Sequence, residues 1–134
     1  MYVVLPVMIP LVSAAVALLA LRHLWVQRVL GVVGAVGLLL AAIALFATVT
    51  EHGIQVVQVG DWPAPFGITL VCDRFSALMV LVTGVIGTAV AVYSVVNIGE
   101  QRQSFAYFPL LHVLLMSVTA AFLAGDVFNL YVWF

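Results

Sequence analysis

Charged side chains are scarce in this sequence of 134 residues, which has four arginines, no lysine and five acidic residues. A soluble domain typically carries about 25% charged residues, whereas 7% of these residues are charged and 66% are hydrophobic. Water would not solvate a surface of this composition, so we expect lipid to surround most of the chain. The net charge of −1 leaves no basic patch, and we expect no nucleic acid partner.

Metal-binding and catalytic patterns are also missing from the sequence. The single cysteine, Cys72, excludes an internal disulfide. His23, His52 and His112 lie far apart and do not have metal-ligand spacing. Nothing in the sequence resembles a nucleophile–base arrangement or a phosphate-binding loop. We therefore expect no metal site and no cofactor.

Long uncharged runs are what the sequence has instead. A helix that crosses a bilayer core of about 30 Å needs roughly 20 apolar residues, and backbone in lipid must satisfy its own hydrogen bonds. The runs predict an all-α integral membrane protein, a multi-span helical bundle with spans at about 1–21, 29–50, 75–97 and 105–124. A fifth, truncated span starts at 127. Because its apolar run breaks off at Phe134, we expect the chain to be the N-terminal fragment of a larger subunit.

The segment between the second and third spans has a different composition. Residues 51–72 contain three glycines and two prolines, and the stretches 54–59 and 68–71 are β-prone. A turn-forming Gly-Asp-Trp-Pro-Ala-Pro sequence separates them, which predicts a β-hairpin on the outer face of the membrane. Trp62 and Phe66 would then lie at the level of the lipid headgroups.

The basic residues predict the orientation in the membrane. Arg22 and Arg28 lie between the first two spans, whereas Arg74 is outnumbered by acidic residues between the second and third. Basic residues near span ends favour the cytoplasm, so the N-terminus is expected outside. Arg102 then also falls inside. We predict a multi-pass protein of the plasma membrane.

Small residues recur in the second and third spans, where they let transmembrane helices approach closely. They are Gly31, Gly34 and Gly37 in the second span and Gly84, Gly87 and Ala91 in the third. Close packing within a bundle is the simpler interpretation, and a gating hinge is the alternative.

His112 lies near the middle of the fourth predicted span and is the sharpest candidate for chemistry. Ionisable residues within a membrane usually face a bundle interior or a water path, and histidine titrates near neutral pH. One interpretation is a member of a proton relay. The other is a neutral histidine that is hydrogen-bonded to a neighbouring helix.

Three further polar residues lie at predicted helix starts. Asp126 opens the fifth span, where it could cap the helix, serve as an acid at the mouth of a proton pathway, or do both. Asp73 and Ser76 precede or begin the third span, and we interpret them as a structural helix cap.

Four stretches resemble one family. Residues 123–134, LAGDVFNLYVWF, resemble the start of the fifth helix in the D subunit of Mrp-type monovalent cation/proton antiporters. Residues 60–68, GDWPAPFGI, and 73–79, DRFSALM, resemble the outer hairpin and third-helix start of that family. Residues 107–112, YFPLLH, look like its fourth helix.

The resemblance implies a bundle of fourteen helices with both termini outside, and kinship with proton-pumping subunits of complex I and membrane-bound hydrogenases. It implies exchange of a monovalent cation, most simply Na⁺, for protons, with other antiporter subunits as partners. The central Glu and Lys of the family lie outside this chain, the Glu directly after the position of Phe134. Two alternatives remain: a proton-pumping membrane-arm subunit of an NADH-quinone oxidoreductase or membrane-bound hydrogenase, and a small membrane assembly protein.

Overall fold

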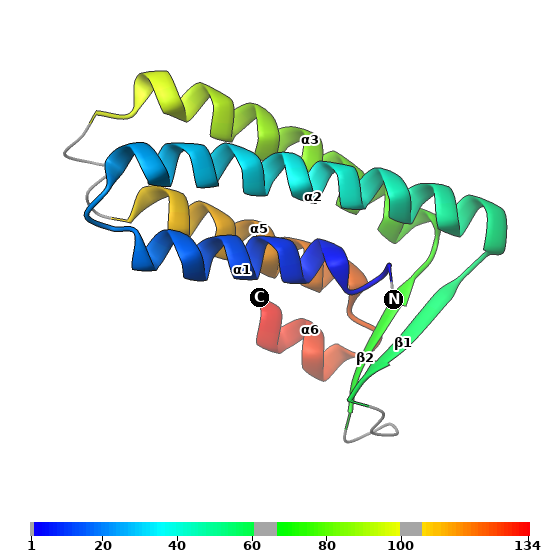
Figure 1. Ribbon diagram of the computed structural model, residues 1–134. Coiled ribbons are helices and arrows are strands. Elements are labelled where there is room, and N and C mark those ends of the chain that lie inside the picture. Colours follow the sequence, from blue (N-terminus) through cyan, green and yellow to red (C-terminus); the bar gives the residue numbers. More distant parts are fainter. Residues whose placement is uncertain (1, 61–66, 100–105) are drawn as a thin grey trace.

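A computed structural model of the chain describes residues 2–60, 67–99 and 106–134. Four helices form a bundle, a β-hairpin crosses one end of it, and a short helix lies beside it (Figure 1). In chain order the elements are α1 (Leu5–Leu19), α2 (Leu24–His52), β1 (Gln55–Val59), β2 (Ile68–Cys72), α3 (Arg74–Asn97), α5 (Tyr107–Leu123) and α6 (Val127–Trp133). The predicted locations of Trp62, Phe66 and Arg102 fall outside the described residues.

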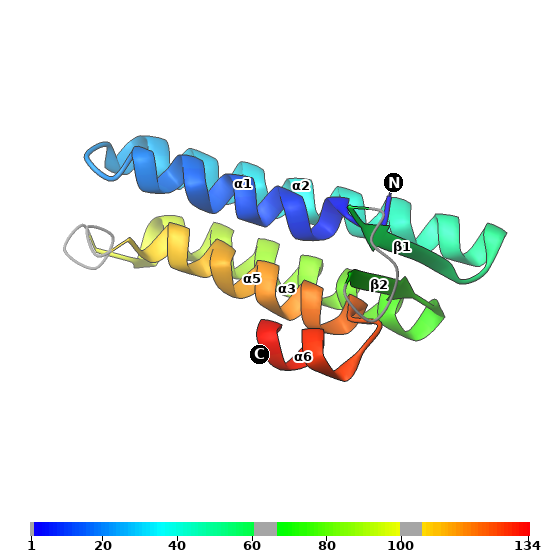
Figure 2. The ribbon, with the colours of Figure 1, turned by 90° about the horizontal axis from the view of Figure 1, so that it is seen from below.

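The bundle has two layers, with α1 and α2 in one and α3 and α5 in the other (Figure 2). The helices α2 and α3 are long and apolar enough to cross a membrane, judged by length and composition. The helices α1 and α5 are apolar but shorter than the spans predicted at 1–21 and 105–124. Pro6 stands in the first turn of α1, where its fixed backbone angle favours helix initiation.

The connection between α1 and α2 is shorter than the sequence indicates. The predicted spans leave residues 22–28 between them, but α2 already begins at Leu24. Gln27 and Arg28 therefore belong to the first turns of α2, and Gln27 is fully buried. The long apolar run that follows continues the helix without interruption to His52.

Small residues of α2 and α3 allow neighbouring side chains to approach the backbone. A Cβ at Gly31 would overlap the ring of Phe108, and one at Gly87 would lie 2.7 Å from Leu115. Since neither gap accepts a methyl group, these glycines set the close packing of α2 and α3 against α5.

The hairpin pairs with the chain beyond α5. The strands β1 and β2 are antiparallel, with Gln55 opposite Cys72 and Val59 opposite Ile68. Leu70 of β2 forms an isolated bridge with Ala124. The hairpin therefore holds the junction between α5 and α6.

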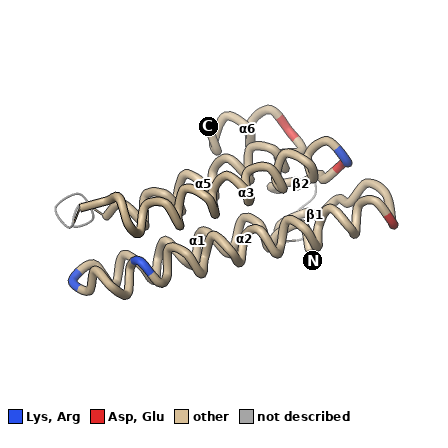
Figure 3. The backbone as a smooth tube through the Cα atoms, turned by 90° about the horizontal axis from the view of Figure 1, so that it is seen from above, with Lys and Arg blue, Asp and Glu red and all other residues tan. Residues whose placement is uncertain are grey.

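Charges separate along the bundle (Figure 3). Arg22 and Arg28 lie at the end where α1 meets α2. The hairpin end carries Glu51, Arg74 and the acidic residues that precede α3 and α6. Each described charge is thus near an end of the bundle and none lies at its middle.

Candidate functional site

His112 is buried between helices, with no exposed surface. Its Nε2 lies 3.1 Å from the backbone oxygen of Gly31 on α2. A carbonyl oxygen only accepts, so Nε2 carries the hydrogen and donates it. In the neutral ring Nδ1 is then an acceptor, and this buried atom has no hydrogen-bond partner among the described residues.

A third helix completes the surroundings of His112. A Cβ placed on Gly34 would lie 2.8 Å from His112 Cε1 and would overlap the hydroxyl oxygen of Ser13 on α1. The imidazole and the hydroxyl thus meet at the bare backbone of Gly34. We call this contact region of α1, α2 and α5 the polar seam, and define it by Ser13, Gln27, Gly34, His112 and Thr119.

Thr119 lies two turns along α5 from His112 and is also fully buried. Its hydroxyl lies 2.8 Å from the oxygen of Leu115 and 3.3 Å from the oxygen of Pro6 on α1. The Pro6 carbonyl is available because the residue four positions later, Pro10, has no N–H to donate within the helix. A proline in α1 thus opens a polar contact to α5.

Gln27 is a polar residue of the seam that no motif in the sequence singles out. Its side-chain Nε2 donates to the backbone oxygen of Leu21 at 3.0 Å. Its Oε1 is buried and has no partner among the described residues. The available signal was its spacing, because positions 27, 31 and 34 share one face of a helix.

Asp126 is the N-cap of α6. It accepts hydrogen bonds from the backbone N–H of Asn129, at 2.7 Å, and from the Asn129 side-chain amide. These bonds hold the pKa of the Asp126 carboxyl below its ordinary value, since they stabilise the ionised form. His112 lies eleven residues before the end of α5, or about 16 Å along its axis. The structure therefore does not bring the two proton-pathway candidates together.

Asp73 and Ser76 form the corresponding cap of α3. The Asp73 carboxylate accepts from the Ser76 backbone N–H at 2.7 Å. This bond lowers the pKa of Asp73, because it favours the charged carboxylate. In both caps an aspartate holds the start of a helix at the hairpin end.

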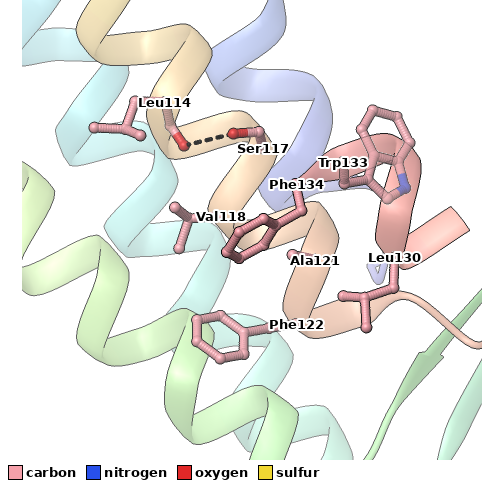
Figure 4. A pocket seen from close by; sticks show the side chains of 8 residues that line it. All are labelled: Leu114, Ser117, Val118, Ala121, Phe122, Leu130, Trp133 and Phe134. Atoms are coloured by element: carbon pink, nitrogen blue, oxygen red, sulfur yellow. Dashed lines mark hydrogen bonds between the residues drawn. The ribbon is translucent and has the colours of Figure 1, made fainter. Parts of the chain in front are cut away.

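The groove between α5 and α6 is apolar. It has a volume of about 380 Å³ and lies where α6 runs beside α5, with Phe122, Leu130 and Phe134 around it (Figure 4). Ser117 is its one hydroxyl-bearing lining residue, and its hydroxyl donates to the Leu114 oxygen. This groove therefore suits helix packing rather than ion binding. Within the described part of the chain, no three His, Cys, Asp or Glu side chains come together as a metal site.

Comparison with known proteins identifies relatives over the whole chain. It is 40% identical over 134 residues to the D subunit of a Na⁺/H⁺ antiporter from Bacillus subtilis, a match that covers 99% of the chain and 27% of that protein. It is 38% identical to the protein of the same name from Alkalihalophilus pseudofirmus, and 36% identical to the D subunit of a probable K⁺/H⁺ antiporter from Rhizobium meliloti. No protein-family model matches the chain.

Two solved structures share the fold. The Mrp complex from Dietzia matches with a TM-score of 0.86 at 29% identity, covering 98% of this chain and 25% of the other. The archaeal membrane-bound sulfane sulfur reductase, a respiratory complex, matches with a TM-score of 0.88 at 27% identity, covering 98% and 27%. The chain spans about a quarter of the length of these relatives. The resemblance inferred from residues 60–134 thus extends along the whole chain, which is a homologue of the D subunit of the Mrp-type Na⁺/H⁺ antiporters.

Proposed function

We propose that this chain is part of a membrane subunit in a multi-subunit monovalent cation/proton antiporter, and that Na⁺ is the cation. The observation that carries this proposal is the 40% identity to the D subunit of a Na⁺/H⁺ antiporter over 99% of the chain. The transported species are protons and a cation, so the chain acts as a transporter subunit rather than as an enzyme. Its partners are the other subunits of the complex and the lipid bilayer.

The proposed topology places the N-terminus outside the plasma membrane and Arg22 in the cytoplasm. The separation of Arg22 and Arg28 from the acidic hairpin end supports it (Figure 3). With α1, α2, α3 and α5 as membrane spans, the hairpin and the start of α6 lie at the outer surface. The helices α1 and α5, which are shorter than α2 and α3, pack against each other across the two layers (Figure 2). We place both in the membrane as spans because both are apolar.

In this proposal His112 and Asp126 belong to the proton pathway. His112 is a buried ionisable group with one nitrogen anchored to Gly31 and the other open to a proton. Asp126 is an acid at the outer end of the bundle, where it meets water. Histidine is suited to this role because it exchanges protons near neutral pH.

The likeness to the sulfane sulfur reductase favours a second candidate, a proton-pumping subunit of a redox complex. The higher identity to the antiporter subunits favours antiport. The two candidates differ in the process to which proton movement is coupled. Antiport moves protons in exchange for a cation, whereas a redox pump moves them by means of electron transfer.

Everted membrane vesicles that contain the whole subunit with its partner subunits distinguish the candidates. A fluorescent probe reports the pH gradient that respiration creates. Added NaCl should dissipate that gradient, and KCl should do so less, whereas vesicles without the partner subunits should not respond. Dissipation by neither salt, together with proton pumping driven by an electron donor in the purified complex, would favour the redox pump.

A further inference from the structure

The polar seam contains two buried acceptors that have no partner among the described residues. One is Gln27 Oε1 and the other is His112 Nδ1. Gln27 cannot reverse its amide, because Nε2 is the donor to the Leu21 oxygen and reversal would set two oxygens against each other. The hydrogen of the neutral His112 ring cannot move from Nε2 to Nδ1 either, because an unprotonated Nε2 would set two acceptors against each other at the Gly31 oxygen. Both atoms therefore need an external donor.

Water is the donor that we infer for both atoms. An unsatisfied buried acceptor is costly, and ordered water commonly satisfies such groups. One water has two O–H groups, so a short file of waters satisfies an amide oxygen at one end and an imidazole nitrogen at the other. The same file can carry a proton to Nδ1, because each water passes a proton to the next along their hydrogen bonds.

The order of the side chains along α2 defines a path. Gln27, Gly31 and Gly34 follow each other on one helix face, and the span from 27 to 34 is about 10 Å. The ring of Phe108 covers Gly31, and His112 lies against Gly34. Phe108 is fully buried, and its ring packs on the stretch of α2 between the two unpaired acceptors. Water that moves along this helix face would have to pass the ring, which we therefore call the constriction.

The path ends at His112 rather than crossing the bundle. The next buried polar group toward the hairpin end is Thr119, whose hydroxyl already bonds to backbone oxygens of its own helix. Thr119 therefore has no need of a water. The opposite end of the seam lies near the connection between α1 and α2, which carries Arg22.

We propose that the seam between α1, α2 and α5 admits water from the Arg22 end, and that this water delivers protons to His112 past Gln27 and Phe108. Gln27 and Phe108 are positioning residues: Gln27 holds the water and Phe108 limits its passage. The delivery of protons rests on the proposed role of His112. The presence of water in the seam does not depend on that role. The labelling and antiport measurements below therefore test the water and the proton delivery separately.

Thiol labelling measures water in the seam directly. Ser13→Cys, in a Cys72→Ser background of the whole complex, places a thiol on α1 opposite Gly34 and His112. Because Ser13 is partly buried rather than fully buried, the change in its labelling rate on substitution of Gln27 or Phe108 is the decisive readout. The probe is the permanently charged reagent methanethiosulfonate ethyltrimethylammonium, applied to one face of sealed membrane vesicles and quantified on complex purified through a partner subunit. Ala91→Cys is the control, because it is fully buried in α3, about one turn from Thr88, whose hydroxyl bonds to Ala35.

We expect Ser13→Cys to be labelled from the side that Arg22 faces, and Ala91→Cys to remain unlabelled. Gln27→Leu should slow the labelling of Ser13→Cys roughly tenfold, the effect expected when one hydrogen bond to water is lost. Phe108→Leu should accelerate it. If Gln27→Leu does not assemble, Gln27→Met replaces it, since it also removes the acceptor.

Labelling of Ser13→Cys no faster than of Ala91→Cys would overturn the proposal. So would labelling that neither Gln27 nor Phe108 substitutions alter, because water would then enter elsewhere. Labelling as expected with unchanged antiport in His112→Ala would keep the hydrated seam and reject the proton role of His112. Impaired antiport in His112→Ala without labelling would keep that role and reject the seam.

Discussion

Gly125 donates its backbone N–H to the backbone oxygen of Thr69 at 2.8 Å, which ties the junction of α5 and α6 to the hairpin. The contact allows no side chain at this position, since a Cβ at Gly125 would lie 2.8 Å from both the Thr69 oxygen and Val71 Cγ2. The direction of α6 and the location of Asp126 therefore depend on β2. A segment more than fifty residues earlier in the chain sets where α6 begins.

Gly125→Ala should destabilise the protein by about 1–3 kcal/mol, the usual cost of overpacking. The added methyl group must displace β2 or the start of α6. The melting temperature of the detergent-solubilised complex measures the effect. Gly99→Ala is the control, because a Cβ there meets nothing within 4 Å. Equal melting temperatures for the two variants would show that the hairpin does not hold this junction.

The Asp73 cap predicts a pH dependence of stability. Its pKa is lower in the folded protein, so the carboxylate stabilises the fold above the ordinary pKa of aspartate, about 3.9. This contribution is lost as the pH falls through the lower folded-state pKa. Asp73→Ala should lower the melting temperature at neutral pH and should make the melting temperature fall less as the pH is lowered. Asp73→Asn still caps the helix, so its melting temperature at neutral pH should lie closer to that of the unchanged protein. A melting curve of Asp73→Ala that follows the unchanged protein at every pH would contradict the cap.

Asp126 allows its two candidate roles to be separated. Asn at this position still accepts from the Asn129 backbone N–H but cannot bind and release a proton. Asp126→Asn should keep the melting temperature close to that of the unchanged complex and should slow antiport in everted vesicles. Full antiport activity in Asp126→Asn would restrict this residue to capping.

Cys72 should be unreactive in the folded protein. Burial raises the pKa of its thiol to about 11, and the neighbouring Asp73 carboxylate adds to the increase. Since the thiolate is the reactive form, about one thiol in ten thousand is reactive at pH 7. Maleimide should label Cys72 slowly until detergent denatures the protein, whereas an exposed Gln58→Cys in a Cys72→Ser background should react at once. Similar rates at the two positions would contradict the buried location.

Local features of the fold were predictable from the sequence. Glycine and proline bound the β-prone stretches that form β1 and β2, and an aspartate precedes both α3 and α6. These signals depend on residues a few positions apart. The start of α2 does not follow from the charges, because α2 begins at Leu24, between Arg22 and Arg28.

The seam itself depends on contacts that no local pattern encodes. The His112–Gly31 hydrogen bond joins residues 81 positions apart, and the Thr119–Pro6 contact joins residues 113 apart. The sequence indicated that His112 is buried, but its partner follows from which faces of α1, α2 and α5 pack together. Gln27 was missed for the same reason, since its burial is decided by its neighbours in space.

The most direct test of the account concerns proton movement by His112 in the complete complex. His112→Gln retains a side-chain N–H that can reach the Gly31 oxygen but cannot bind a proton. Thr119→Val is the control, since it removes a buried hydroxyl of the same seam without removing a titratable group. Antiport rates are measured in everted vesicles from about pH 6 to pH 9, a range that begins near the ordinary pKa of histidine, about 6.5.

We predict that His112→Gln assembles and lowers the antiport rate about tenfold or more, as expected when a proton-transfer group is lost, whereas Thr119→Val remains within about twofold of the unchanged complex. An antiport rate in assembled His112→Gln that is unchanged over this pH range would show that His112 only packs the seam.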